Sequence, residues 1–333
     1  MRPGLIDGFG RPITYLRVSV TDRCNLRCSY CMAGEVSFSP RREVLTIEEL
    51  ELLTSAFVAC GIRKVRITGG EPLVRKGVMH LFQGLSRHLK SGLLDELCMT
   101  TNGILLAKYA SGLAECGVRR LNVSLDTLDR DRFAEITSGG DIDLVLKGID
   151  AARDAGMAIK LNAVAQKGYI ERDAEALVQF AQDRRLDITF IETMPLGEVK
   201  SNCADHYLPL GELRQLIERR WRLSDTDEST GGPARYVRVD DTGGRIGFIT
   251  ALSHCFCESC NRLRLSATGS LYTCLGHDDF TDFRAIVRQQ GDIGGRIEDA
   301  IRSAVAAKPK SHDFGVSPSR EPALKRQMSV LGG

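Results

Sequence analysis

Short apolar runs alternate with longer amphipathic segments along the first two thirds of the chain. Six runs rich in β-branched and other apolar residues predict strands at residues 15–20, 64–68, 96–100, 120–125, 158–163 and 187–191. The segments between them carry apolar residues at helical spacing, and strands that alternate with helices form parallel sheets. The pattern therefore predicts an α/β protein built from six βα units.

One of the connecting helices has clear start and stop signals. Thr46, with Glu49 three residues later, matches a capping box; Leu53 and Phe57 follow at helical spacing, and Gly61 ends the segment. Six βα units are fewer than the eight of a closed barrel. We therefore expect an open, partial barrel or a doubly wound sheet.

The two faces of the predicted strands differ in polarity. One set of alternate positions is apolar, as at Val18, Ile67 and Val123, which is typical of a face covered by helices. The other set is polar and comprises Arg17, Ser19, Arg66, Thr68, Thr100, Asn102, Asn122, Ser124, Lys160 and Asn162. An ordinary barrel interior is packed with aliphatic side chains, and unpaired buried cations are costly. The polar face therefore predicts a cavity that holds a ligand.

Cations on three of these strands indicate the charge of that ligand. Arg17, Arg66 and Lys160 share the polar face, and such a convergence favours an anion such as a polyphosphate. Internal ion pairing is the alternative.

Beyond residue 200 the alternation ends. A predicted helix at 209–220 leads into a Ser/Thr/Gly-rich stretch at 224–232 and two β-like runs at 236–239 and 245–249. We therefore divide the chain into a barrel core, residues 1–222, and a C-terminal region, residues 223–333.

Composition excludes several classes of protein. The 333 residues are 43% hydrophobic and 26% charged, which argues against disorder, and the formal net charge of +2 argues against a nucleic acid polymer as partner. No apolar run is long enough to cross a bilayer, and the N-terminus lacks a secretory signal. We expect a cytoplasmic protein that binds no membrane.

Seven of the eleven cysteines fall in two clusters. In a reducing compartment such clusters are usually metal-binding or catalytic. Cys24, Cys28 and Cys31 follow the first predicted strand, at the end where barrel active sites are built. Three thiolates leave one iron of a cubane cluster without a protein ligand, which implies a reactive site; a zinc site completed by a distant residue is the alternative. The isolated cysteines are interpreted as small buried hydrophobes: Cys60, Cys98, Cys116 and Cys203.

The second cysteine cluster lies in the C-terminal region. Cys257, Cys260 and Cys274 form a C-x2-C-x13-C arrangement, and His277 three residues later makes a Cys3His zinc site plausible. Cys255 could replace Cys257 as a ligand. The spacing alone leaves zinc and iron-sulfur open.

Two further motifs flank these clusters. Gly69-Gly70-Glu71-Pro72 ends the second predicted strand, where glycines let the backbone approach a ligand, although a tight turn is the more usual explanation of such a motif by itself. Arg262 and Arg264 share strand parity beside the second cluster, which suits phosphate recognition. A solvated charged face is the alternative there.

Together these motifs resemble the radical S-adenosylmethionine (SAM) superfamily. The resemblance rests on C-x3-C-x2-C with Tyr30 inside it after the first strand and on Gly-Gly-Glu-Pro after the second. The second cysteine cluster, with Asn-Arg-Leu-Arg at 261–264, and the terminal Gly332-Gly333 are similar to the GTP 3',8-cyclase family of molybdenum cofactor biosynthesis. The resemblance covers nearly the whole chain.

The resemblance implies a partial barrel with two 4Fe-4S clusters, the second in a C-terminal extension. Cys24, Cys28 and Cys31 would hold the SAM-binding cluster and Cys257, Cys260 and Cys274 the second, to which guanine would bind; His277 would not be a ligand. SAM would be cleaved to methionine and 5'-deoxyadenosine while GTP is converted to (8S)-3',8-cyclo-7,8-dihydroguanosine 5'-triphosphate. Since the cofactors supply the difficult chemistry, no acid–base residue is expected.

The family motifs also imply binding residues. The SAM contacts would be Tyr30, Gly70, Ser124 and Met194. The GTP contacts would be Arg17, Arg66, Thr100, Lys160, Arg262 and Arg264, which include the three cations of the polar strand face. Gly332 and Gly333 resemble a tail that reaches into the active site.

The implied partners are a reductant for the clusters and a cyclic pyranopterin monophosphate synthase that takes the product; a homodimer is compatible with the sequence. Two alternatives are a different radical SAM reaction, such as peptide maturation, and a zinc-stabilised binding module or electron carrier. The three cations and the Arg-x-Arg pair favour a nucleotide substrate over a peptide substrate. The predicted polar cavity argues against an electron carrier, because an electron carrier does not need such a cavity.

Overall fold

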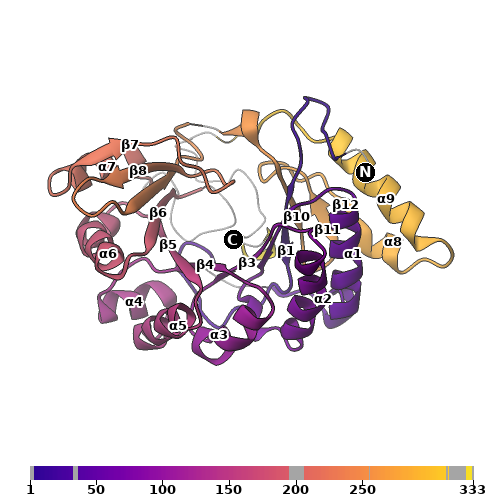
Figure 1. Cartoon of the computed structure of the whole chain (residues 1–333), viewed down its shortest axis with the longest axis horizontal. Coiled ribbons are helices and arrows are strands. Elements are labelled where there is room, and N and C mark those ends of the chain that lie inside the picture. Colours follow the sequence, from indigo (N-terminus) through magenta and orange to yellow (C-terminus); the bar gives the residue numbers. More distant parts are fainter. Residues whose placement is uncertain are drawn as a thin grey trace.

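A curved, mostly parallel sheet forms the centre of the protein. The computed structural model describes residues 4–32, 37–194, 206–254, 256–312, 314 and 328–331. Within this part of the chain twelve strands form one sheet in the order β12-β11-β10-β1-β2-β3-β4-β5-β6-β9-β8-β7. Figure 1 shows the sheet bent around a central space, with α1 to α6 on its outer side.

The elements alternate as the sequence predicts. The strands are β1 (Tyr15–Ser19), β2 (Lys64–Thr68), β3 (Glu96–Thr101), β4 (Arg120–Ser124), β5 (Ala158–Ala165), β6 (Asp187–Glu192), β7 (Leu223–Asp225), β8 (Arg235–Val239), β9 (Arg245–Ile249), β10 (Arg262–Leu265), β11 (Ser270–Tyr272) and β12 (Thr281–Asp282). The helices are α1 (Ile47–Ala59), α2 (Val78–Lys90), α3 (Leu106–Glu115), α4 (Arg130–Thr137), α5 (Ile142–Asp154), α6 (Ile170–Arg184), α7 (Leu210–Glu218), α8 (Phe283–Val287), α9 (Ile293–Ala306) and α10 (Met328–Leu331).

The expectation of a six-stranded sheet is wrong, although all six predicted strands exist. In the described chain β10 pairs in parallel with β1, and β9 pairs in parallel with β6, so the C-terminal region extends the parallel sheet at both sides. The edge strands β12 and β7 are not paired with each other, and the barrel is therefore open. The pairing of β10 with β1 joins segments far apart in the chain, which local periodicity does not encode.

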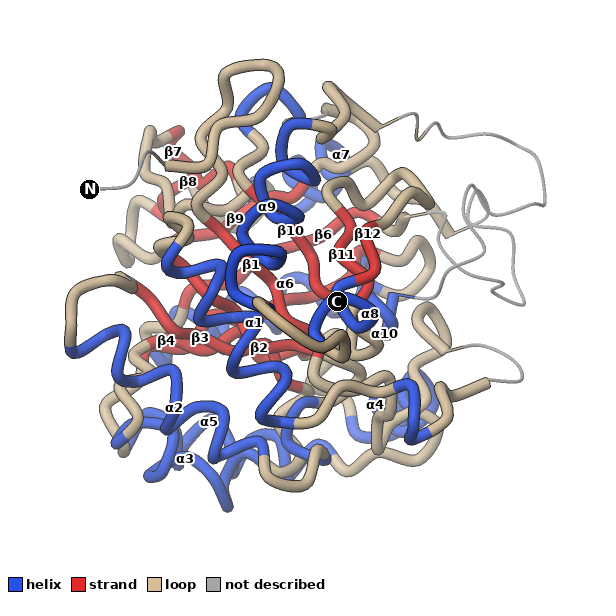
Figure 2. Tube along the Cα trace, turned by 90° about the vertical axis from the view of Figure 1, so that its right-hand side faces the viewer, coloured by secondary structure: helices blue, strands red, loops and turns tan. Residues whose placement is uncertain are grey.

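The predicted start of α1 is confirmed. The Thr46 side chain accepts from the amide of Glu49, and the Glu49 side chain accepts from the amide of Thr46, which completes the capping box. Leu53 and Phe57 are fully buried, and the Phe57 ring lies 5.5 Å from that of Phe283 in α8. Figure 2 shows α1, α8 and α9 on the same side of the sheet.

The difference between the two faces of the strands is also confirmed. The apolar positions, including Leu16, Val18, Ile67 and Val123, are completely buried beneath the helices. The lone cysteines Cys60, Cys98 and Cys116 are buried as predicted, while Cys203 lies outside the described residues. The polar face is left to line the inside of the curve.

Candidate active site

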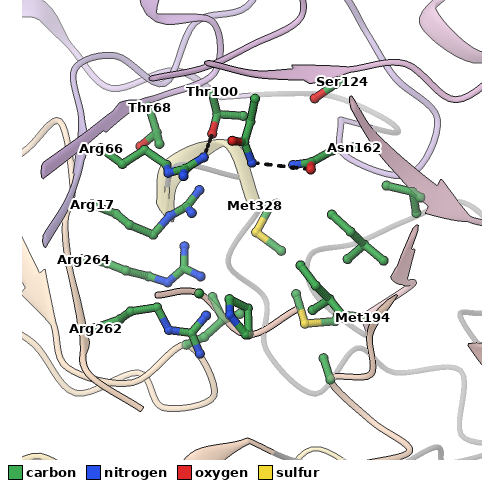
Figure 3. A pocket seen from close by; sticks show the side chains of 18 of the residues that line it. Arg17, Arg66, Thr68, Thr100, Ser124, Asn162, Met194, Arg262, Arg264 and Met328 are labelled. Atoms are coloured by element: carbon green, nitrogen blue, oxygen red, sulfur yellow. Dashed lines mark hydrogen bonds between the residues drawn. The ribbon is translucent and has the colours of Figure 1, made fainter. Parts of the chain in front are cut away.

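A cavity of about 330 Å³ lies on the polar face of the sheet. Nine of the ten polar positions predicted from the strand pattern line it; Ser19 does not, and its hydroxyl instead donates to the carbonyl of Thr21. Figure 3 shows Arg66, Arg17, Arg264 and Arg262 side by side, with their guanidinium groups pointing into the cavity. The structure therefore contains a cavity on the face where the sequence predicts a ligand.

The N-terminal cysteine loop forms one wall of this cavity. Cys24, Cys28 and Cys31 all line it. The loop is held against the end of α4, because the amide of Arg27 donates to the Thr137 carbonyl at 3.0 Å. The loop at 137–141 thus packs directly on the motif.

The environment of these thiols favours metal binding over free thiolates. Burial, with a further contribution from Asp126, raises the pKa of Cys28 well above its usual value, and burial also raises the pKa of Cys24. A thiol in such a place deprotonates when a metal ion compensates the negative charge. Soft thiolate ligands suit iron-sulfur clusters, zinc or Cu(I).

The glycine turn packs against the cysteine loop. A Cβ atom on Gly70 would lie 2.3 Å from the carbonyl oxygen of Arg23, and one on Gly69 would lie 2.6 Å from that of Thr21. The turn is also pinned to β3, since the buried Glu71 carboxylate accepts from the Asn102 amide at 2.7 Å. These glycines are required by a close approach of two backbones, and Gly70 additionally lines the cavity.

The four residues that the resemblance assigns to SAM lie in one cavity: Tyr30, Gly70, Ser124 and Met194. The Tyr30 hydroxyl donates to Asp126 at 2.7 Å, and the amide of Val164 donates to the same carboxylate at 2.8 Å. Burial raises the pKa of Asp126 to about 6. Asp126 follows the end of β4 and fixes the orientation of Tyr30, a role that the sequence pattern does not indicate.

Five predicted cations line the cavity on four strands: Arg17 on β1, Arg66 on β2, Lys160 on β5, and Arg262 and Arg264 on β10. Arg17 and Arg264 are register partners in the sheet. Burial, together with repulsion from Arg66 and Arg262, lowers the pKa of Arg17 to about 10. Burial and the nearby Arg17 lower the pKa of Arg264 well below its usual range. These shifts mean that the site stabilises an anion placed among the guanidinium groups.

Arg66 has well-defined partners. Its Nε donates to the Tyr15 hydroxyl at 2.5 Å, and its Nη1 donates to Thr100 Oγ1 at 3.2 Å, a bond drawn in Figure 3. The predicted substrate contact Thr100 therefore also orients the Arg66 guanidinium.

Lys160 is buried on β5, four strands along the sheet from Arg17 on β1. Its Nζ donates to the Tyr236 hydroxyl at 3.1 Å, and the side chain lies above the Tyr236 ring. Burial, assisted by repulsion from Arg66 and Arg120, lowers the pKa of Lys160 to about 7. Lys160, which the polar face of the strands predicts, lines the cavity.

Two further cations were missed. Lys64 and Arg120 also line the cavity, and both form ion pairs with Glu96, at 2.8 and 2.7 Å. The signal was present in the sequence, since Lys64 has the strand parity of Arg66 and Arg120 that of Asn122. Among the described lining residues, seven are lysine or arginine and Glu192 is the one carboxylate.

The C-terminal cysteines lie at the same cavity. Cys257, Cys260 and Cys274 all line it, and Cys257 is buried. Burial opposes ionisation of Cys260, but the positive charges of Arg262 and Lys308 outweigh it and lower the pKa to about 7.

His277, the other described candidate ligand of the second cluster, does not line the cavity. A ring nitrogen of His277 lies 2.9 Å from the Ser311 carbonyl oxygen. Cys255 is outside the described residues, as are Gly332 and Gly333. Met328 of α10 lines the cavity, a position that no sequence motif indicates.

Two features are absent from the described residues. No group of three or more histidine, cysteine, aspartate or glutamate side chains among them has the arrangement that holds a single metal ion. No helix in this part of the chain is sufficiently long and apolar to span a membrane.

Comparison with protein families divides the chain into two matched regions. The model described as "Radical SAM superfamily" matches residues 18–181. The model described as "Molybdenum Cofactor Synthesis C" matches residues 186–314.

Individual proteins agree with this assignment. The chain is 55% identical to a GTP 3',8-cyclase of Agrobacterium fabrum and 57% identical to one of Caulobacter vibrioides, with 99% of this chain and 94% of each relative covered. Among solved structures it resembles SuiB of Streptococcus suis bound to S-adenosylmethionine, at a TM-score of 0.64 and 16% identity, over 96% of this chain and 78% of that one. The structural likeness concerns the fold alone, whereas the sequence identity establishes that the chain belongs to the GTP 3',8-cyclase family of the radical SAM superfamily.

Proposed function

We propose that this chain converts GTP to (8S)-3',8-cyclo-7,8-dihydroguanosine 5'-triphosphate, the first step of molybdenum cofactor biosynthesis. The observation that carries the proposal is one cavity bordered by two cysteine triads, with seven cationic side chains and a single carboxylate among its described lining residues. Neither a zinc-stabilised binding module nor an electron carrier accounts for that excess of positive charge next to two thiol clusters.

Each cysteine triad suits a 4Fe-4S cluster with one iron left open. In this proposal Cys24, Cys28 and Cys31 hold the SAM-binding cluster, and the residues at 257, 260 and 274 hold the second one. The fit rests on the donor chemistry, because each triad places three thiols at the cavity, and the raised pKa values of Cys24 and Cys28 mean that these thiols need a metal to ionise. When bound, the N-terminal cluster supplies the electron that cleaves SAM to methionine and a 5'-deoxyadenosyl group able to take a hydrogen atom from GTP.

The protein's own contribution on the SAM side is orientation. Tyr30 is fixed by Asp126, and Gly70 lines the cavity without a side chain. Ser124 and Met194 lie at the ends of the strands β4 and β6 and complete the proposed SAM site. Val164 and Ile191 add apolar surface that keeps water from the reacting atoms.

On the substrate side, the cations neutralise and orient the triphosphate. Arg17, Arg66, Arg262 and Arg264 provide planar donors suited to phosphate oxygens, and Lys160 adds a point charge. Thr100 orients Arg66. With the triphosphate fixed at the arginines, the guanine is proposed to reach the C-terminal cluster, and the ribose then lies toward the SAM site.

The proposal also covers the two regions of the chain, the cellular compartment and the partners of the enzyme. The core at 1–222 and the C-terminal region at 223–333 act as one catalytic unit, which is supported by the entry of β9 and β10 into the sheet of the core. We place the enzyme in the reducing cytoplasm, where cysteine clusters are usually metal-binding. The proposed partners are a reductant for the clusters, a downstream cyclic pyranopterin monophosphate synthase and a second copy of this chain in a homodimer. Gly332 and Gly333 are proposed to form a tail that reaches into the active site.

Formation of 5'-deoxyadenosine tests the assignment. Anaerobically reconstituted protein is mixed with SAM, a strong reductant and either GTP, ATP or no nucleotide, and the products are separated by mass spectrometry. We expect GTP alone to stimulate cleavage and to yield a product of the mass of GTP with a different retention time. Cleavage at the same rate with every nucleotide would remove GTP as the substrate, and no cleavage by iron-replete protein would exclude radical SAM chemistry.

A further inference from the structure

A buried lysine that does not line the cavity lies beside the segments that carry the C-terminal cysteines. Lys308 follows the end of α9 and is 2% exposed. Its Nζ donates to the Arg262 carbonyl at 3.1 Å and also to the Thr273 carbonyl. Arg262 is two residues after Cys260, and Thr273 directly precedes Cys274. One ammonium group therefore ties together two of the three segments that carry the cysteines.

The third segment is tied by a second buried cation from the N-terminal arm. Arg11 Nη1 donates to the Cys257 carbonyl at 2.7 Å. The same guanidinium donates to the carbonyls of Pro309 and Lys310, at 2.6 and 2.7 Å, immediately after Lys308. Arg11 has its own counter-ion, since its Nε donates to Asp7 at 2.5 Å.

The two cations differ in how their charge is compensated. Burial lowers the pKa of Lys308, and the positive charges of Arg11 and Arg262 add to this effect, whereas negative charge on Cys260 and Cys274 raises it. A buried ammonium without an anionic partner is strongly unfavourable. The position of Lys308 thus becomes favourable when Cys260 and Cys274 carry negative charge, as they do as cluster ligands.

A purely local role for Lys308 does not fit its contacts. A lysine after a helix often caps the last carbonyls of that helix. The hydrogen bonds of Lys308 Nζ go instead to β10 and to the residue after β11, the two segments that flank Cys260 and Cys274.

We propose that Arg11 and Lys308 form a two-cation brace around the C-terminal cysteines, and that Lys308 also makes the cluster held there easier to reduce. The inference rests on the proposed second cluster. Arg11 holds the Cys257 segment in place, while Lys308 positions the other two segments and contributes a positive charge. Reduction adds one negative charge to the cluster, and a fixed positive charge nearby stabilises the reduced form more than the oxidised one. Both are positioning residues, since neither lines the cavity.

The test compares full-length Lys308→Met, which keeps the apolar stem, with Lys308→Arg, which keeps the charge. Lys310→Met is the matched control, because Lys310 is exposed and Arg11 contacts only its backbone carbonyl. Each variant is made in a full chain with Cys24→Ser, Cys28→Ser and Cys31→Ser, so that the remaining cluster is the C-terminal one. Its midpoint potential is measured by a redox titration followed by electron paramagnetic resonance.

We expect Lys308→Met to lower the ratio of reduced to oxidised cluster at a fixed potential by about tenfold, which is about 59 mV for one electron. Lys308→Arg and Lys310→Met keep the potential of the parent. Arg11→Lys, which loses the planar fork, lowers the iron content while the clusters that do form keep the parent potential.

The outcomes separate the two halves of the inference. An unchanged potential in Lys308→Met, with only a lower melting temperature, shows a structural role and overturns the electrostatic one. Full iron content in both Arg11→Lys and Lys308→Met overturns the brace. If the parent with the three serines binds no iron, the proposed second cluster itself is wrong, and that result is distinct from either failure.

Discussion

The pH dependence of GTP binding provides a direct test of the cationic site, because one of its members titrates near neutrality. Burial lowers the pKa of Lys160 from 10.5 to about 7, with repulsion from Arg66 and Arg120 as further causes. At 1.36 kcal/mol per pKa unit, keeping this side chain charged in the empty cavity costs about 5 kcal/mol relative to water. The empty protein therefore carries mostly neutral Lys160 above pH 7.

A bound triphosphate reverses this balance, because it supplies an anionic partner for the Lys160 ammonium. If the anion selects the ammonium form, each molecule of GTP bound at pH 8 takes up about 0.9 proton, and affinity falls about tenfold per pH unit above 7. GTP adds little to this slope above pH 7.5, since phosphate groups have lost their last proton there. Arg17, with its pKa of about 10, begins to titrate only at higher pH.

Titration calorimetry without SAM or reductant measures both quantities, since GTP then binds without turnover. Binding is measured between pH 7.5 and 8.5 in pairs of buffers with different ionisation enthalpies, which gives the number of protons taken up. Lys160→Met is the control: it binds more weakly throughout, takes up no proton and shows a flat profile in this range. A flat wild-type profile with no proton uptake would refute the assignment of a low pKa to Lys160 or its contact with the triphosphate.

Three other substitutions test separate parts of the site. Arg264→Ala is expected to weaken GTP binding about 10- to 100-fold, which is the effect of losing one charged hydrogen-bonding partner. Iron analysis should find both clusters intact, and loss of iron would contradict the role given to Arg264. Gly70→Ala places a Cβ atom 2.3 Å from the Arg23 carbonyl oxygen, so we expect about half of the iron and all SAM cleavage to be lost, whereas Gly211→Ala, with open space around it, leaves both unchanged. The Glu71 carboxylate accepts hydrogen bonds from the backbone amides of Leu73 and Asn102 and from the Thr101 hydroxyl. Glu71→Gln replaces one acceptor oxygen with an NH2 group, and we expect it to lower the free energy of unfolding of the apoprotein in urea by about 1–3 kcal/mol. Equal stability of the variant would show that the turn does not depend on those bonds.

The sequence determined the repeating part of the fold and the chemistry of its inner face. Strands with apolar residues on one face and polar residues on the other have a fixed period of two, so the alternation by itself assigns Arg17, Arg66 and Lys160 to one surface. Lys64 and Arg120 could have been found by the same parity. The capping box at Thr46 was also predicted from the sequence, because both of its residues lie within four positions of each other and the structure confirms the bonds between them.

The tertiary structure decided what closes the cavity. β10 pairs with β1, and the register partners Arg17 and Arg264 are 247 residues apart in the chain. The short, charged run Arg262–Leu265 carries no local signal for such a partner. The same holds for Asp126 behind Tyr30, and for Arg11 and Lys308 beneath the C-terminal cysteines. A motif reports which side chains can do chemistry, but the partners that fix their positions and charges come from distant segments, because packing and hydrogen bonding depend on proximity in space rather than along the chain.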